Sequence, residues 1–176
     1  MTSTYRKEGS RLYLFSIVLV AIIGGLLFGY DTAVVSGAEK ALEEFFRSGL
    51  GDAYTKAWHG FTASSALLGC VVGGAISGFM ASRLGRKRSL IAAAAMFFVS
   101  AVGSWRPESA LLPYGEPSMA LLALFNFYRV LGGVGVGLAS AVCPMYIAEI
   151  APARIRGTLV SCNQFAIIFG MLVVYF

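Results

Sequence analysis

Residues 60–82 read GFTASSALLGCVVGGAISGFMAS and contain no Asp, Glu, Lys or Arg. A charge-free run of about 18 residues or more is typical of a membrane-spanning helix, because about 20 residues at about 1.5 Å each cross the hydrocarbon core of a bilayer. Four further runs with at most one charge each flank this stretch. The predicted spans are residues 12–38, 60–82, 89–105, 119–148 and 157–176. The sequence therefore predicts an all-α membrane protein.

The composition excludes a soluble domain. Hydrophobic residues make up 57% of the 176 residues and charged residues only 13%, whereas soluble domains carry about 25% charged residues. Catalytic and metal-binding constellations are also missing. The three cysteines lie in apolar runs without a C-x-x-C spacing, and the single histidine, His59, is interpreted as a residue of the membrane interface. We expect no enzyme activity, no metal and no cofactor.

Lys and Arg are distributed unevenly among the segments that join the spans. If the N-terminus is cytoplasmic, nine cations lie on the cytoplasmic side and four outside, which satisfies the positive-inside rule. The nine are Arg6, Lys7, Arg11, Arg83, Arg86, Lys87, Arg88, Arg154 and Arg156, and the four are Lys40, Arg47, Lys56 and Arg106. We therefore predict a multi-pass protein of the cell membrane with a cytoplasmic N-terminus. The basic charge indicates topology, and we expect no nucleic-acid partner.

Small residues recur at intervals of four along the predicted spans. The series are Gly25, Gly29, Ala33 and Gly37; Gly69 and Gly73; Gly74 and Gly78; and Gly133 and Gly137. Because lipid supplies no hydrophobic drive between helices, close approach of backbones through small residues holds membrane bundles together. We predict helix packing at most of these positions. An interface at which the helices slide past each other is the alternative, since glycine suits both static packing and movement.

Two charges interrupt the predicted spans, Asp31 and Arg129. A charge at mid-membrane costs at least about 2.5–3.5 kcal/mol, so each is a candidate functional residue. The helical rise places both at similar depth, which makes them possible partners. An opposite charge within about 4–6 Å favours the ionised carboxylate, so movement that separates the two would favour proton uptake. The alternative is a static pair that fixes helix register.

The loop after the second span reads Gly78-Phe-Met-Ala-Ser-Arg-Leu-Gly-Arg-Lys-Arg88. This run resembles the G-x-x-x-D-R-x-G-R-R/K loop of the major facilitator superfamily, with Ser82 in place of the usual Asp. Gly78, Arg83, Gly85 and Arg86 are its matching motif residues. The departure at Ser82 removes a carboxylate from the end of the helix.

The loop after the fourth span reads Pro144-Met-Tyr-Ile-Ala-Glu-Ile-Ala-Pro-Ala-Arg-Ile-Arg-Gly157. It resembles the P-x-Y-x-x-E-x-x-P-x-x-x-R-G signature of the sugar porter family. The resemblance implies a cytoplasmic latch made by Glu149 with Arg83 and Arg156, and Arg154 supplies a further cation nearby. A basic loop that sets topology alone is the alternative.

Residues 24–37 and 161–170 are most similar to those of bacterial xylose/proton symporters within this family. The resemblance covers essentially the whole chain and implies the first five helices of a twelve-helix carrier, so residues 1–176 are interpreted as an incomplete N-terminal domain that lacks its C-terminal helices. It further implies that Asp31 couples protons with Arg129 as its partner, since facilitative members carry Asn at the first position. Gln164 and Phe28 match sugar-contacting residues. Met171 stands where xylose symporters have a second glutamine, which leaves the identity of the sugar open.

The resemblance thus implies a proton-coupled symporter of a xylose-like monosaccharide that works by alternating access, driven by the proton gradient and with no bound cofactor. Three alternatives stay open at this point. The protein could be a facilitative sugar uniporter, a sugar sensor that does not transport, or a truncated inactive remnant. The expected partners are a monosaccharide, the lipid bilayer and the remaining helices of the carrier.

Overall fold

The computed structural model describes residues 11–106 and 117–176, and Arg6 and Lys7 lie outside these ranges. The described part of the chain is helical and contains no strand. Its elements are α1 (Arg11–Leu50), the short 3-10 helix η1 (Gly51–Ala53), α2 (Lys56–Leu84), α3 (Arg86–Trp105), α4 (Met119–Ile150) and α5 (Arg156–Tyr175).

Four helices of the described ranges, α2, α3, α4 and α5, are long and apolar enough to cross a membrane. The first predicted span, residues 12–38, lies within α1. Large apolar side chains such as Val71, Phe98 and Phe165 are exposed in the described chain. In water such a surface would be costly, whereas in a bilayer it meets hydrocarbon. The all-α membrane fold is confirmed.

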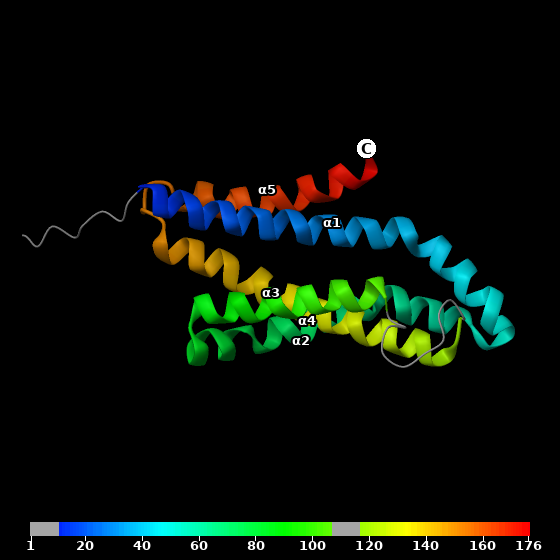
Figure 1. Cartoon of the computed structure of the whole chain (residues 1–176). Helices are drawn as coiled ribbons and strands as arrows, with labels where there is room; N and C mark the ends of the chain where they lie inside the picture. The colour runs from blue at the N-terminus through cyan, green and yellow to red at the C-terminus, as the bar shows by residue number, and fades with distance from the viewer. Residues whose placement is uncertain (1–10, 107–116) are drawn as a thin grey trace, which may run out of the picture.

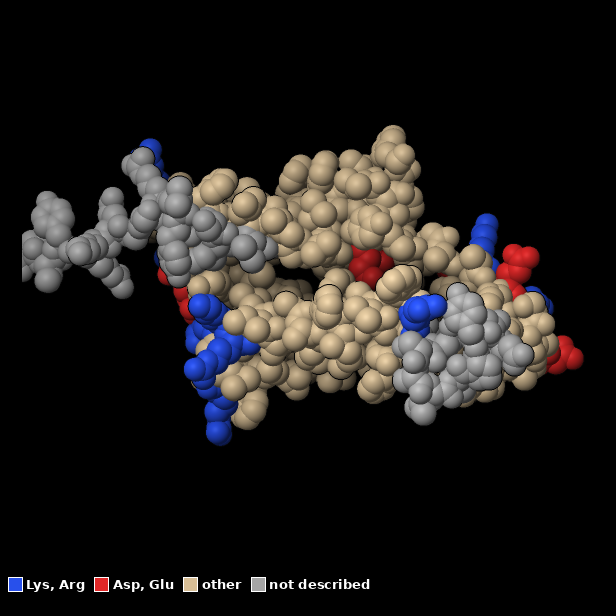
Figure 2. Space-filling view, viewed as in Figure 1, with Lys and Arg blue, Asp and Glu red and all other residues tan. Residues whose placement is uncertain are grey.

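The helices form two groups (Figure 1). α1 packs against α5 in one group, and α2 and α3 pack against α4 in the other. α1 also contacts α4, which joins the two groups. Lys and Arg gather at the end of the bundle where α2 meets α3 (Figure 2), and the residues there are Arg83, Arg86, Lys87 and Arg88.

Glycine permits backbone contact at the interfaces of α2 with α4 and of α1 with α5. A Cβ added to Gly69 would collide with the Val130 carbonyl oxygen on α4, and one added to Gly133 would collide with that of Ala66 on α2. Gly29 meets the Ile167 carbonyl group on α5 in the same way. Packing is therefore the role of these glycines, as predicted. At three other members of the series, Gly37, Gly74 and Gly78, an added Cβ would meet nothing within 4 Å in the described chain, in agreement with a prediction made for most positions and not for all.

The segment between residues 39 and 59, which joins the first two predicted spans, is largely helical. α1 continues through this region to Leu50, and only residues 51–55 connect it to α2. Ala, Glu, Lys and Leu are strong helix formers, so loss of apolar character did not end the helix. The extension is held by Phe46, which is buried against Tyr54, Leu121 and Leu122.

Two further boundaries follow from local backbone preferences. Gly85 connects α2 to α3 with a φ of 82°, a conformation that favours glycine. α4 ends at Ile150 because Ala151 precedes Pro152, and a residue before proline is driven to an extended conformation. Each boundary places a basic segment at the same end of the bundle.

Candidate functional site

The ion pair between Arg129 and Asp31 lies between the two groups of helices. Nη1 of Arg129 on α4 is 3.3 Å from both Oδ1 and Oδ2 of Asp31 on α1. The Arg129 side chain is 10% exposed and that of Asp31 is 35% exposed. A guanidinium group stays protonated in proteins, so the carboxylate is the member of the pair that can gain or lose a proton.

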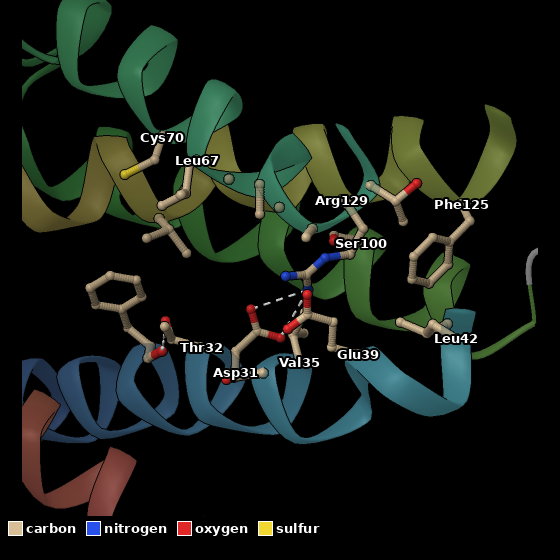
Figure 3. A pocket seen from close by; sticks show the side chains of 18 of the residues that line it. Asp31, Thr32, Val35, Glu39, Leu42, Leu67, Cys70, Ser100, Phe125 and Arg129 are labelled. Atoms are coloured by element: carbon tan, nitrogen blue, oxygen red, sulfur yellow. Dashed lines mark hydrogen bonds and ion pairs between the residues drawn. The ribbon is translucent and has the colours of Figure 1, made fainter. Parts of the chain in front are cut away.

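The packing of the helices brings the side chains of Asp31 and Arg129 together. On α1, Gly29 faces the backbone of α5, whereas Asp31, Val35 and Glu39 point toward α4 (Figure 3). On α4, Gly133 lies one turn beyond Arg129 and contacts the α2 backbone. The glycine contact brings α4 close to α2, and Arg129, one turn away on the same face of α4, reaches Asp31 on α1 through its long side chain.

Asp31 and Arg129 both line a cavity of about 310 Å³. Figure 2 shows a hollow between the helix groups, with an acidic side chain exposed in it. The lining is mostly apolar, with polar groups that converge on it from several helices. The polar lining residues are Asp31, Thr32, Ser36, Glu39, His59, Thr62, Ser100 and Arg129. A mostly apolar cavity with a few converging polar groups is the usual form of a small-molecule site.

The residues matched to sugar contacts are divided between the cavity and α5. Phe28 lines the cavity on α1. Gln164 is exposed on α5, and the Met171 backbone lies beside Gly29 at the interface of α1 with α5. In the described chain α5 supplies no lining residue, because it packs on a different face of α1 from the one that bears Asp31.

At the basic end of the bundle, an ion pair between described residues links α3 to α4. Nη2 of Arg86 is 2.8 Å from Oε1 of Glu149, and Nε of Arg86 donates to the same oxygen at 2.9 Å. Arg83 lies over the Phe79 ring, with 5.2 Å between the guanidinium carbon and the ring centroid. Arg156 donates to the Ala151 carbonyl group at 3.4 Å. Glu149 is therefore paired with Arg86 in this structure, whereas the resemblance pointed to Arg83 and Arg156.

Two other motif residues, Gly78 and Arg154, take no part in the Arg86–Glu149 ion pair. Gly78 faces open space, and Arg154 is exposed in the turn between α4 and α5. Gly85 acts through its backbone conformation, as described above. The motif residues thus gather at one end of the bundle, around the Arg86–Glu149 pair.

Sequence analysis missed a polar cluster at the opposite end of the cavity. His59 was interpreted as an interfacial residue, yet its Nε2 lies 3.2 Å from Oε1 of Glu39, and its Nδ1 lies 3.2 Å from the Tyr54 hydroxyl group. The signal that could have revealed the cluster is the spacing of Asp31, Glu39 and Glu43, which places three carboxylates on one face once α1 is extended. Over residues 11–106 and 117–176, no group of three His, Cys, Asp or Glu side chains has a metal-binding arrangement.

Comparison with known proteins shows which protein family this chain resembles. Residues 17–176 match the family described as "Sugar (and other) transporter". The D-xylose-proton symporter of Escherichia coli K12 is 51% identical over 171 residues, which cover 93% of this chain and 35% of that protein. The glucose facilitated diffusion protein of Zymomonas mobilis is 36% identical over 171 residues, which cover 96% of this chain and 35% of that protein.

A solved structure gives the same result. The xylose transporter XylE from E. coli, in a partially occluded inward-open conformation, superposes with a TM-score of 0.84 at 50% identity. The match covers 93% of this chain and 40% of XylE, so the chain spans well under half the length of these relatives. The family consists of transporters rather than enzymes. This chain therefore belongs to the sugar porter family of the major facilitator superfamily.

Proposed function

We propose that this chain is the N-terminal part of a proton-coupled monosaccharide symporter that works by alternating access. The Asp31–Arg129 pair in the cavity is the observation that carries the proposal. An ionisable pair inside a membrane bundle is costly, and in transporters such groups mark ion and proton pathways. Similarity to a D-xylose-proton symporter supports the same function.

The proposed mechanism starts from the partly exposed carboxylate. Asp31 reaches the cavity, so a proton from water can reach it, and Arg129 holds the ionised form in place. Movement of α1 relative to α4 separates the charges, which favours a protonated Asp31. Once Asp31 is protonated and neutral, it no longer forms an ion pair with Arg129, so this link between the two helix groups is lost. Proton binding is thereby linked to the helix movement that alternates access to the sugar.

The sugar site of the proposal requires helices beyond those described. Gln164 is exposed on α5, where the C-terminal helices of the carrier would cover it. Midplane sites between two repeats are the rule in such transporters. The substrate class is a monosaccharide similar to xylose, with Phe28 and Gln164 as contacts and Met171 as a point of difference. Arg86 and Glu149 would hold the basic end closed, and this end would face the cytoplasm together with the N-terminus.

Facilitated diffusion is the second candidate function. It is supported by the similarity to the glucose facilitated diffusion protein. The ionised pair favours symport, because a uniporter needs no group that changes its charge during the cycle.

The experiment joins this chain at Phe176 to the C-terminal part of the E. coli D-xylose-proton symporter, and the product is called the chimeric carrier below. Xylose added to energy-depleted cells that express it should make the outside alkaline. Asp31→Asn should abolish sugar accumulation and leave exchange of sugar across the membrane intact, and this exchange also shows that the variant is assembled. Sugar uptake that ignores the proton gradient would support facilitated diffusion instead.

A further inference from the structure

His59 joins the start of α2 to the extended part of α1. Its Nε2 lies 3.2 Å from Glu39 Oε1 and 3.9 Å from Glu43 Oε2. Its Nδ1 lies 3.2 Å from the hydroxyl oxygen of Tyr54, in the connection between the two helices. The His59 side chain is 21% exposed, so water reaches the cluster without filling it.

These contacts determine which nitrogen of the neutral imidazole carries the proton. A carboxylate accepts hydrogen bonds and cannot donate them, so Nε2 carries a hydrogen and donates it to Glu39. Nδ1 is then an acceptor for the Tyr54 hydroxyl group. Addition of a proton to Nδ1 turns both nitrogens into donors, and the Tyr54 oxygen can accept the new hydrogen bond after its O–H rotates. The cluster therefore has a complete set of partners for the imidazole in both charge states.

Charged groups of both signs lie around this position. A hollow of about 200 Å³ next to His59 is lined by Glu43, Asp52, Arg47 and Lys56, together with Tyr54. With Glu39, three carboxylates and two cations lie around the imidazole, of which Glu39 and Glu43 contact it, and Arg47 is already paired with Glu43 at 3.5 Å. Glu39 and Glu43 are one turn apart on α1, where like charges repel. An imidazolium group between them relieves this repulsion.

The cluster belongs to the same cavity as the Asp31–Arg129 pair. Both His59 and Glu39 line that cavity, and Asp31 and Glu39 lie on the same face of α1 (Figure 3). Eight residues separate the two carboxylates, which corresponds to about 12 Å along the helix. His59 and Glu39 thus lie about two turns from the ion pair, at the end of the cavity away from the basic loops.

We propose that His59 is a second proton-binding site of this cavity, and that its protonated form links the start of α2 to α1 through Glu39 and Glu43. The proton comes from water at this end of the cavity and is bound at Nδ1. Loss of this proton leaves the hydrogen bond from Nε2 to Glu39 and the one that Nδ1 accepts from Tyr54, and it removes the charge that attracts Glu43. The use of the site in transport rests on the proton coupling proposed above, whereas proton binding by the imidazole does not.

The test uses the fact that the sequence contains one histidine. The chain is prepared with ¹⁵N-labelled histidine in lipid nanodiscs, so that NMR reports a single imidazole between about pH 5 and about pH 8, the range in which histidine titrates. We expect a neutral form with the hydrogen on Nε2 at high pH and protonation of Nδ1 at low pH. Glu39→Gln should reduce the preference for the Nε2–H form. Asp31→Asn, which removes a carboxylate of the same cavity without touching His59, should leave the tautomer unchanged.

The link between helices has its own readout. Amide hydrogen exchange of residues 39–50, corrected for the intrinsic rate, should be several-fold slower at about pH 5.5 than at about pH 8. His59→Gln retains a donor for Glu39 but binds no proton, so this difference should disappear. An imidazole that keeps one protonation state throughout, or an exchange difference that survives in His59→Gln, would overturn the proposal. Neither readout needs transport, so failure of the chimeric carrier to couple protons is a separate result.

Discussion

Nη1 of Arg129 lies 3.3 Å from each carboxylate oxygen of Asp31, although 98 residues separate the two in the sequence. The pair joins α1 to α4 inside the cavity, where each helix group otherwise packs mainly with itself. This contact between the two helix groups is an ion pair, so it depends on the charges of both side chains. The stability and the transport properties of the protein should both respond to changes in this contact.

The two partners should differ in how much stability their removal costs. Asp31→Leu leaves a guanidinium group that is 10% exposed without a counter-charge, whereas Arg129→Met leaves a carboxylate that is 35% exposed. We expect Asp31→Leu to lower the free energy of unfolding more, with both losses below the about 3–5 kcal/mol of a fully buried pair. The double variant should recover most of the loss. Unfolding of the chain in detergent measures this, and equal losses without recovery would contradict the account.

Glycine substitutions should separate packing positions from open ones. A Cβ at Gly133 would meet the Ala66 carbonyl oxygen, whereas a Cβ at Gly74 meets nothing within 4 Å. Gly133→Ala should destabilise the chain by about 1–3 kcal/mol, since the α2–α4 interface has to open. Gly74→Ala should be neutral or stabilising by up to about 1 kcal/mol, because alanine suits a helix better. Thermal unfolding of the purified chain compares the two, and similar effects would disprove the assigned interface.

Sequence patterns predicted the helical fold because apolar runs with few charges are long and unambiguous. They also placed Asp31 and Arg129 at one depth, since helical rise converts residue number into distance. They missed the end of α1, because Glu39, Glu43 and Arg47 end the apolar run without ending the helix. The partner of Glu149 could not be predicted either. Several arginines lie within reach of it in the sequence, and only the packing of α3 on α4 selects Arg86.

The Arg86–Glu149 pair should contribute little to stability. Its side chains are 39% and 45% exposed, and exposed pairs contribute about 0–1 kcal/mol. Glu149→Gln should therefore change the unfolding free energy by less than about 1 kcal/mol, and the change should shrink further in high salt. Arg83→Gln is the matched control, because Arg83 lies over the Phe79 ring. A large, salt-independent loss in Glu149→Gln would show that the pair is more than a surface contact.

Tyr54 should make the chain less stable at alkaline pH. Burial raises the pKa of Tyr54 above its ordinary value, Glu43 adds to the rise, and a hydrogen bond with Thr62 opposes it. A raised pKa means that the folded state prefers the neutral phenol. The stabilisation is complete below the ordinary value of about 10 and is lost as the pH rises through the folded-state value.

Tyr54→Phe should remove this part of the alkaline loss, whereas Tyr175→Phe, at an exposed position near the end of α5, should retain it. The free energy of unfolding between about pH 9 and about pH 12 measures the difference, a range that contains the ordinary tyrosine value. Identical alkaline profiles for wild type and Tyr54→Phe would contradict the assigned environment of this residue.

Proton flux during sugar addition tests the central claim most directly. Xylose is added to energy-depleted cells that express the chimeric carrier, and the external pH is recorded for wild type and for Asp31→Asn. The account predicts alkalinisation with the wild type and none with the variant, while sugar exchange continues in both. Sugar entry without any proton movement, or alkalinisation that persists in Asp31→Asn, would contradict the assignment of Asp31 as the coupling group.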